Sequence, residues 1–169
     1  DRSNEILKRI WTEKKNIKYL RYARNNGVMK SIFTAIKYIE TDACAIFDCD
    51  LQDSPKLLTD FIRNWEMGIE IVYGKRIKRK EVFFLGLLRN IFKKISFKVR
   101  GYNIEIESGA WFLDKEVIKE IKDKEFDPFL PALIDKLGFN SIGIPYERIE
   151  RKRGFSKFDF FNYLSYAAD

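Results

Sequence analysis

Hydrophobic residues recur along this chain with two different spacings. Apolar positions three and four residues apart predict amphipathic helices, and short continuous apolar runs predict buried strands. The predicted helices cover residues 4–15, 28–40, 55–67, 81–99 and 130–137, and two more begin at residues 115 and 158. The predicted strands cover residues 17–22, 43–47, 69–73, 110–113 and 141–145. Because the two kinds of element alternate, we expect an α/β fold with a mostly parallel sheet flanked by helices.

The predicted helix over residues 55–67 has the clearest boundaries. Ser54 is a preferred N-cap residue, Pro55 suits the first helical position, and Gly68 suits the end of a helix. An acidic cluster directly precedes Ser54 and follows the predicted strand over residues 43–47. We therefore expect this cluster at the carboxyl end of a strand, where α/β sheets bind their ligands.

The amino-acid composition excludes several kinds of active site. The 169 residues fit one domain, residues 1–169, and include no histidine. A Ser-His-Asp triad and a histidine-ligated zinc site are therefore excluded. Cys44 and Cys49 lie five residues apart in one apolar run, so on a strand they point to opposite faces and cannot form a disulfide. Two reduced thiols are typical of a cytosolic protein.

The positive charge of the chain is concentrated in one segment. The net charge is +7, and residues 75–100 contain ten Lys or Arg against one acidic residue, Glu81. This segment predicts an anionic partner such as a phosphate or an anionic membrane. The predicted helix over residues 81–99 mixes basic and aromatic residues, as does an interfacial membrane helix, and the aromatic helix from residue 158 could act in the same way. Core packing or an oligomer contact are the alternatives for both helices.

The acidic cluster carries the candidate metal chemistry. Asp48, Asp50 and Gln52 alternate along an extended segment, which puts their side chains on one side of the backbone. Carboxylate and amide oxygens are suitable ligands for Mg²⁺ or Mn²⁺. The alternative is an ordinary loop whose acidic residues cap a helix.

Four segments resemble the motifs of the family 2 inverting glycosyltransferases, in particular the branch that acts on polyprenyl phosphates. They are Arg24-Asn25-Asn26-Gly27, Asp48-Cys49-Asp50-Leu51-Gln52-Asp53-Ser54-Pro55, Val72-Tyr73-Gly74-Lys75-Arg76 with Arg79, and Tyr146 to Phe158 with its arginines. The second segment resembles the Asp-x-Asp-Leu-Gln-Asp-x-Pro metal motif of this family. The four motifs occur in the family's order over nearly the whole chain. The resemblance implies a GT-A fold and a membrane-associated transferase on the cytoplasmic face.

The resemblance also implies roles for individual residues. A metal would be held by Asp48, Asp50 and Gln52, and Asp50 would be catalytic through that metal. Contacts to the nucleotide-sugar donor are implied for Asp1, Ser3, Arg24, Asn25, Gly27, Asp48 and Arg76. Contacts to the acceptor phosphate are implied for Arg79, Arg148, Arg151, Ser156 and Lys157. Asp53 after Gln52 resembles the members that use uridine nucleotides, which favours UDP over GDP.

One stretch departs from the family pattern, and another matches only the end of a family motif. Residues 108–111 read Ser-Gly-Ala-Trp where relatives often carry an acidic residue and an arginine, so Glu107 becomes the candidate for a catalytic carboxylate. Residues 1–5 resemble the end of a longer family motif. The resemblance therefore implies a first strand before residue 1 and, in many relatives, membrane helices beyond residue 169. We expect this chain to be the catalytic part of a longer protein.

Other classes of function are weighed against this interpretation. A nucleic-acid-binding domain would use the basic segment but leaves the acidic cluster without a role, so we expect no nucleic-acid partner. A family 2 transferase that modifies a glycan or protein hydroxyl, and a catalytically inactive fragment, remain alternatives. Membrane-associated relatives often assemble, which leaves a homo-oligomer open.

Overall fold

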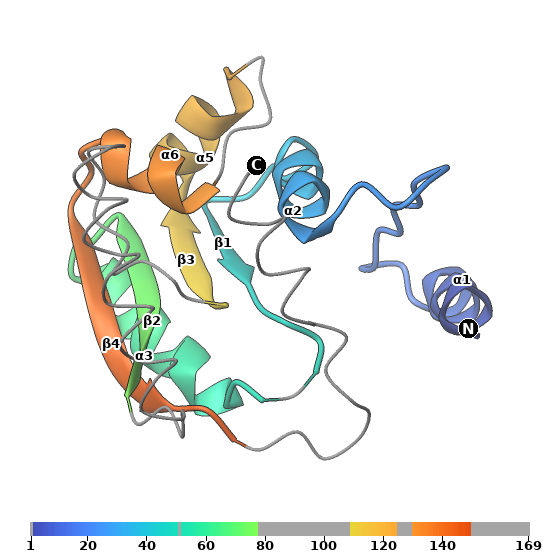
Figure 1. Ribbon diagram of the computed structural model, residues 1–169, viewed down its shortest axis with the longest axis horizontal. Helices are drawn as coiled ribbons and strands as arrows, with labels where there is room; N and C mark the ends of the chain where they lie inside the picture. The colour runs from blue at the N-terminus through green and yellow to red at the C-terminus, as the bar shows by residue number, and fades with distance from the viewer. Residues whose placement is uncertain (1, 51, 78–108, 125–129, 150–169) are drawn as a thin grey trace, which may run out of the picture.

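A computed structural model describes residues 2–50, 52–77, 109–124 and 130–149, with the side chains of residues 130 and 131 excepted (Figure 1). The predicted helices over residues 81–99 and from residue 158 lie outside the described residues. Within the described part, no helix has the length and apolar character that crossing a membrane requires.

Four strands form one sheet in the order β1-β3-β2-β4. They are β1 (Ala43–Ile46), β2 (Ile71–Ile77), β3 (Trp111–Asp114) and β4 (Ser141–Glu147). β3 pairs antiparallel with both β1 and β2, and β2 pairs parallel with β4. β1, β2 and β4 therefore run in one direction and β3 in the other. The predicted α/β class is confirmed, with a sheet that is mixed because β3 runs antiparallel to both of its neighbours.

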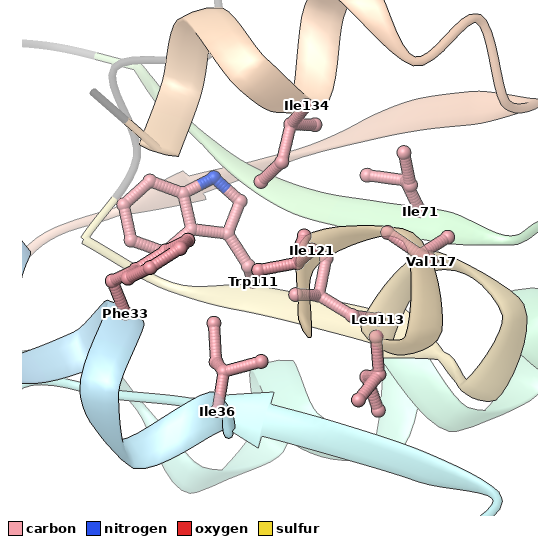
Figure 2. Packing of buried hydrophobic residues seen from close by; sticks show 9 residues of the cluster. Phe33, Ile36, Ile71, Trp111, Leu113, Val117, Ile121 and Ile134 are labelled. Carbon is pink, nitrogen blue, oxygen red and sulfur yellow. The ribbon is translucent and has the colours of Figure 1, made fainter. Parts of the chain in front are cut away.

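Helices cover both faces of this sheet (Figure 1). Five helices are described: α1 (Ser3–Glu13), α2 (Val28–Ile36), α3 (Pro55–Glu66), α5 (Lys115–Lys122) and α6 (Leu130–Lys136). Alternating residues of β3 separate the core into two clusters, since Trp111 packs with α2, α5 and α6 whereas Phe112 packs with α3. Figure 2 shows the first cluster, with the Trp111 indole between Phe33 and Ile134.

The predicted helix boundaries depend on local side-chain chemistry. The Ser54 hydroxyl accepts a hydrogen bond from the backbone N–H of Lys56, and Pro55 is the first residue of α3. Gly68, just past the end of this helix, has a φ of 92° that other residues rarely adopt. Asp114 caps α5 in the same way as Ser54, by accepting from the N–H of Glu116.

Several sequence predictions need correction. The helix predicted over residues 28–40 ends earlier, at Ile36. Residues 17–22 do not form a strand, because a strand exists only where a neighbouring strand pairs with its backbone, and this segment has no such ladder among the described residues. The strand predicted over residues 69–73 instead spans Ile71–Ile77, because β2 pairs with β4 along its whole length. β4 itself reaches Glu147, two residues past the predicted end.

Candidate active site

Charged side chains meet at one edge of the sheet. Ile46 of β1 and Tyr73 of β2 are both paired with Trp111, the first residue of β3. The ends of β1 and β2 and the beginning of β3 therefore lie at the same edge, together with the end of the parallel strand β4. The acidic cluster follows β1 at this edge, as the sequence predicted. In Figure 1 it is the lower edge of the sheet, where β4 ends below α3.

Three carboxylates surround the guanidinium of Arg148. The Nη2 atom of Arg148 lies 2.8 Å from Oδ2 of Asp48 and 3.5 Å from Oδ2 of Asp50. Its Nε atom lies 3.2 Å from Oδ1 of Asp53, a residue whose side chain is fully buried. This last contact is an ion pair without hydrogen-bond geometry. The family resemblance implied that Arg148 contacts the acceptor phosphate, whereas here its guanidinium pairs with the acidic cluster.

The loop that carries the cluster is bound to the chain beyond β4. The backbone N–H of Ile149 donates to the carbonyl of Gln52 at 3.0 Å, and the Gln52 side-chain amide donates to the carbonyl of Ile149 at 2.9 Å. Gln52 also donates its backbone N–H to Oδ1 of Asp50 at 3.2 Å. Gln52, a predicted metal ligand, thus orders the loop around Asp50 and uses its amide nitrogen to do so.

A buried tyrosine links Asp53 to the next basic side chain. The hydroxyl of Tyr146 on β4 donates to Oδ1 of Asp53 at 2.7 Å and accepts from Nε of Arg76 on β2 at 3.2 Å. Burial raises the pKa of Tyr146 above its usual value; the Arg76 hydrogen bond opposes that shift and the Asp53 hydrogen bond adds to it. The tyrosine therefore stays protonated at neutral pH and can donate to the carboxylate.

Gly109 lets the backbone before β3 approach these groups. A Cβ atom on Gly109 would lie 2.5 Å from Nη2 of Arg76, 2.9 Å from Oδ2 of Asp48 and 3.5 Å from Oδ2 of Asp53. Any side chain at this position would collide with the cluster, so the glycine keeps room for it. Arg76 Nη2 and Asp48 Oδ2 therefore border the same small space above Gly109. Oδ2 of Asp53 is buried and has no hydrogen-bond partner among the described residues, which marks a polar position that a ligand or water could satisfy.

Two of the three predicted metal ligands, Asp48 and Asp50, lie close together. The described residues contain no group of three or more acidic, cysteine or histidine side chains arranged to hold a metal ion. Asp48 and Asp50 nevertheless direct one oxygen each at the same nitrogen of Arg148. A cation at that point would contact both carboxylates. The two residues thus fit a divalent ion with hard oxygen ligands, with other positions left for water and phosphate.

The predicted donor-binding residues of the N-terminal region lie elsewhere. The side chain of Asn25 accepts from the N–H of Gly27 at 2.9 Å, and Arg24 donates to the side chain of Asn26 at 3.2 Å. Gly27, with a φ of 82°, directly precedes α2, so this motif forms the turn that starts the helix. Ser3 begins α1, which lies apart from the sheet in Figure 1.

Several predicted residues are outside the described residues, and their roles remain predictions. They are Asp1, Arg79, Glu107, Arg151, Ser156 and Lys157. Conversely, the sequence analysis assigned no role to Tyr146 and used Asp53 only as a hint about the nucleotide. The available signal was that both residues belong to the quoted motifs, Tyr146 two positions before Arg148 and Asp53 directly after Gln52.

Cys44 and Cys49 differ in their surroundings. Cys44 on β1 is partly buried against the core, and burial raises the pKa of its thiol to about 11. Cys49 is exposed between Asp48 and Asp50. Both are free thiols, as predicted.

Comparison with known proteins identifies the family. Residues 1–122 match the glycosyl transferase family 2 domain, which implies a GT-A fold. The whole chain is 33% identical to the uncharacterized glycosyltransferase YkcC of Bacillus subtilis and covers 53% of that protein. It is 28% identical, over 83% of its length, to the bactoprenol glucosyl transferase of Shigella phage SfV, of which it covers 47%. The chain thus spans about half the length of these relatives, and it belongs to glycosyl transferase family 2.

Proposed function

We propose that this glycosyltransferase moves a sugar from a nucleotide-sugar, preferably a UDP-sugar, to a polyprenyl phosphate, with inversion at the anomeric carbon and with Mg²⁺ or Mn²⁺. The observation that carries the proposal is the convergence of Asp48 and Asp50 on one cationic nitrogen at the carboxyl edge of the sheet. The relatives named as bactoprenol glucosyl transferases support a lipid-linked acceptor. The preference for a UDP-sugar rests on the resemblance of Asp53 and its neighbours to the same segment of family members that use uridine nucleotides.

The metal would be held by Asp48 and Asp50, with Gln52 supporting it. When bound, such an ion acts as a Lewis acid that neutralises the charge growing on the departing nucleoside diphosphate. Nη2 of Arg148 stands where the two carboxylate oxygens converge. We therefore expect Arg148 to neutralise the cluster in the donor-free protein and to leave it when a divalent ion enters. Release would make its guanidinium available to the acceptor phosphate, the role that the sequence analysis assigned to it.

Arg76 is the residue that we assign to the donor diphosphate. Its Nη2 atom is the closest atom to the point where a Gly109 Cβ would be, and Oδ2 of Asp48 borders the same point. A planar guanidinium matches the oxygens of a phosphate group with parallel hydrogen bonds. One cationic side chain next to the proposed metal position would share the neutralisation of the leaving group.

A phosphate acceptor suits the residues of this chain. The chain contains no histidine, so a general base would have to be a carboxylate, a lysine or a tyrosine. A polyprenyl phosphate is already an anion and attacks without losing a proton to the enzyme. A single displacement by this anion inverts the anomeric carbon. The basic and aromatic segments predicted from the sequence, residues 81–99 and from residue 158, would hold the chain at the membrane surface where such lipids lie.

Calorimetric titration with nucleotides tests the donor and the metal together. UDP and GDP are titrated into the protein with Mn²⁺ and again with excess EDTA. We expect UDP to bind with Mn²⁺ and to lose most of its affinity with EDTA. Equal binding under both conditions would contradict the metal proposal, and tighter binding of GDP would contradict the choice of nucleotide. Absence of binding of either nucleotide under both conditions would contradict the donor proposal.

Transfer assays test the acceptor. Radiolabelled sugar is followed from UDP-glucose and other UDP-sugars to undecaprenyl phosphate in detergent, with a soluble glycan as the competing acceptor. We expect transfer to the lipid, and we expect Arg151→Ala to reduce transfer more than it reduces UDP binding. Transfer to the glycan alone would favour a hydroxyl acceptor. Equal losses of transfer and binding in Arg151→Ala would remove that residue from the acceptor site.

A further inference from the structure

We propose that Tyr146 is a positioning residue that aims the Arg76 guanidinium at the donor diphosphate. The inference rests on the proposed function, because it assumes that Arg76 meets the donor. It goes further by assigning a task to a buried residue for which the sequence analysis had none.

The contacts of the Tyr146 hydroxyl define its orientation. A phenol has one hydrogen to donate and lone pairs that can accept. The hydrogen goes to Oδ1 of Asp53 at 2.7 Å, and a lone pair accepts from Nε of Arg76 at 3.2 Å. Because a charged residue stands on each side, reversing the hydroxyl would leave both contacts unmade. The buried tyrosine, 9% exposed, therefore has one favourable arrangement.

The ring of Tyr146 is held as firmly as its hydroxyl. It belongs to the core cluster beneath α3, together with Leu57, Phe61, Val72 and Phe112. The backbone of Tyr146 is paired with that of Arg76 across β4 and β2. Because the ring is fixed by the sheet and α3, the hydrogen bond from Arg76 to its hydroxyl restricts the motion of the guanidinium.

The hydrogen bond uses the Nε–H of Arg76 and leaves both Nη groups for other partners. A guanidinium has five N–H donors, of which the tyrosine takes one. Nη2 of Arg76 lies beside Oδ2 of Asp48, on either side of the space that Gly109 leaves open. A phosphate bound by a metal on Asp48 would come within reach of this nitrogen.

A neutral partner suits this task better than a carboxylate. A carboxylate paired with Arg76 would cancel the charge that an anionic donor requires. The tyrosine instead restricts the guanidinium and leaves its charge in place. Nε of Arg148 lies 3.2 Å from Oδ1 of Asp53, the oxygen that also accepts from Tyr146. Asp53 contacts Arg76 through the tyrosine hydroxyl, so it holds the tyrosine without pairing directly with the arginine.

Tyr146→Phe removes the hydroxyl and keeps the ring. We expect this variant to bind UDP in the presence of Mn²⁺ about tenfold more weakly than wild type, the effect of one lost hydrogen bond to a charged group. In an Arg76→Ala background the same substitution should cause no further loss, because the tyrosine acts through the arginine. A purely structural tyrosine would instead give equal losses in both backgrounds, which would overturn the proposal.

Tyr73→Phe is the matched control. This substitution also removes one tyrosine hydroxyl, but from β2. The ring of Tyr73 lies against Gly143 and packs against the core cluster that contains Trp111. We expect it to leave UDP affinity unchanged. If both phenylalanine variants weaken binding equally, the effect of Tyr146 is not specific and the proposal fails.

A spectroscopic measurement decides the positioning role without any nucleotide. The ¹⁵N–¹H signal of Arg76 Nε, assigned by its loss in Arg76→Lys, should exchange slowly with water in wild type and at least tenfold faster in Tyr146→Phe. Unchanged exchange would overturn the proposal even if UDP binds well. A protected Nε signal in a protein that binds neither UDP nor GDP would instead contradict the donor assignment and leave the tyrosine–arginine contact intact.

Gly109→Ala provides a second variant that leaves the tyrosine untouched. Its methyl group would lie 2.5 Å from the present position of Arg76 Nη2, so the guanidinium must shift. We expect a loss of UDP affinity of about tenfold, as for Tyr146→Phe. Wild-type affinity in this variant would show that the placement of Arg76 does not matter for donor binding and would overturn the proposal.

Discussion

Helices α1 and α3 are both amphipathic, but only α3 buries its apolar side. They contain 11 and 12 residues, and each carries an apolar stripe on one side. α3 buries Leu57 and Phe61 completely, at 3% and 0% exposure. α1 buries no residue, and Ile6, Leu7 and Trp11 on its stripe remain 45–47% exposed.

The difference lies in what each helix is connected to. α3 directly links β1 to β2 and packs against the sheet through β2, β3 and β4. α1 is separated from the sheet by α2 and by residues 14–26, which form no helix or strand (Figure 1). An apolar stripe thus determines that a helix has a side to bury, whereas a neighbouring element determines whether that side is buried. For the site this matters, because α3 begins directly after the acidic cluster.

The largest expected effect comes from Phe61 at the centre of the α3 contact. Phe61→Ala should reduce the free energy of unfolding by about 3–5 kcal/mol, since it leaves a cavity beneath the sheet. Urea denaturation followed by circular dichroism measures the change. Ile62→Ala, at the partly exposed neighbouring position, is the control and should cost clearly less. Similar losses in both variants would mean that α3 does not pack as described.

The next effect concerns the loop that directly precedes α3. Asp50→Ala should weaken UDP binding in Mn²⁺ by about 100-fold, because one of two converging carboxylates is lost, and should leave the folded state intact. Calorimetry measures the affinity and circular dichroism the fold. Asp60→Ala removes an acidic residue from within α3 and should bind UDP as wild type does. Unchanged Mn²⁺-dependent binding in Asp50→Ala would refute the metal site.

The N-terminal caps offer a smaller and more direct comparison of the two helices. Ser54→Ala should destabilise the protein by about 1 kcal/mol, because the N–H of Lys56 loses its acceptor. Arg2 occupies the equivalent position of α1 and makes no side-chain cap. Arg2→Ala should therefore not change the midpoint of urea denaturation measurably. A larger loss in Arg2→Ala than in Ser54→Ala would reverse the comparison.

The smallest effect is expected on the exposed stripe of α1. Trp11→Ala should change the free energy of unfolding by less than about 0.5 kcal/mol, since the side chain is 47% exposed and packs into neither core cluster. Tryptophan fluorescence of the wild type should also show water-exposed emission from this residue. A loss of about 2 kcal/mol or more, of the size found for buried side chains, would mean that α1 packs against the sheet in solution.

Local features of this protein follow directly from its residues. The two ends of α3 could be predicted from Ser54, Pro55 and Gly68, because helix capping and left-handed backbone depend on single residues and their near neighbours. The acidic cluster follows a strand, as expected, but that strand is not buried as predicted, because β1 lies at the end of the described strand order and is covered by fewer neighbours. The motif order was enough to predict the glycosyltransferase family, which the match over residues 1–122 confirms.

Which distant segments meet depends on the tertiary fold. β3 inserts antiparallel between β1 and β2, and residues 17–22 form no ladder with any described strand, because strand pairing depends on partners far along the chain. Arg148 reaches Asp48 across 100 residues, and Tyr146 reaches Asp53 across 93. Such contacts leave no periodic signal in the sequence, since they arise from the parallel alignment of β4 with β2. The tertiary fold therefore brings together side chains that the sequence could identify only one by one.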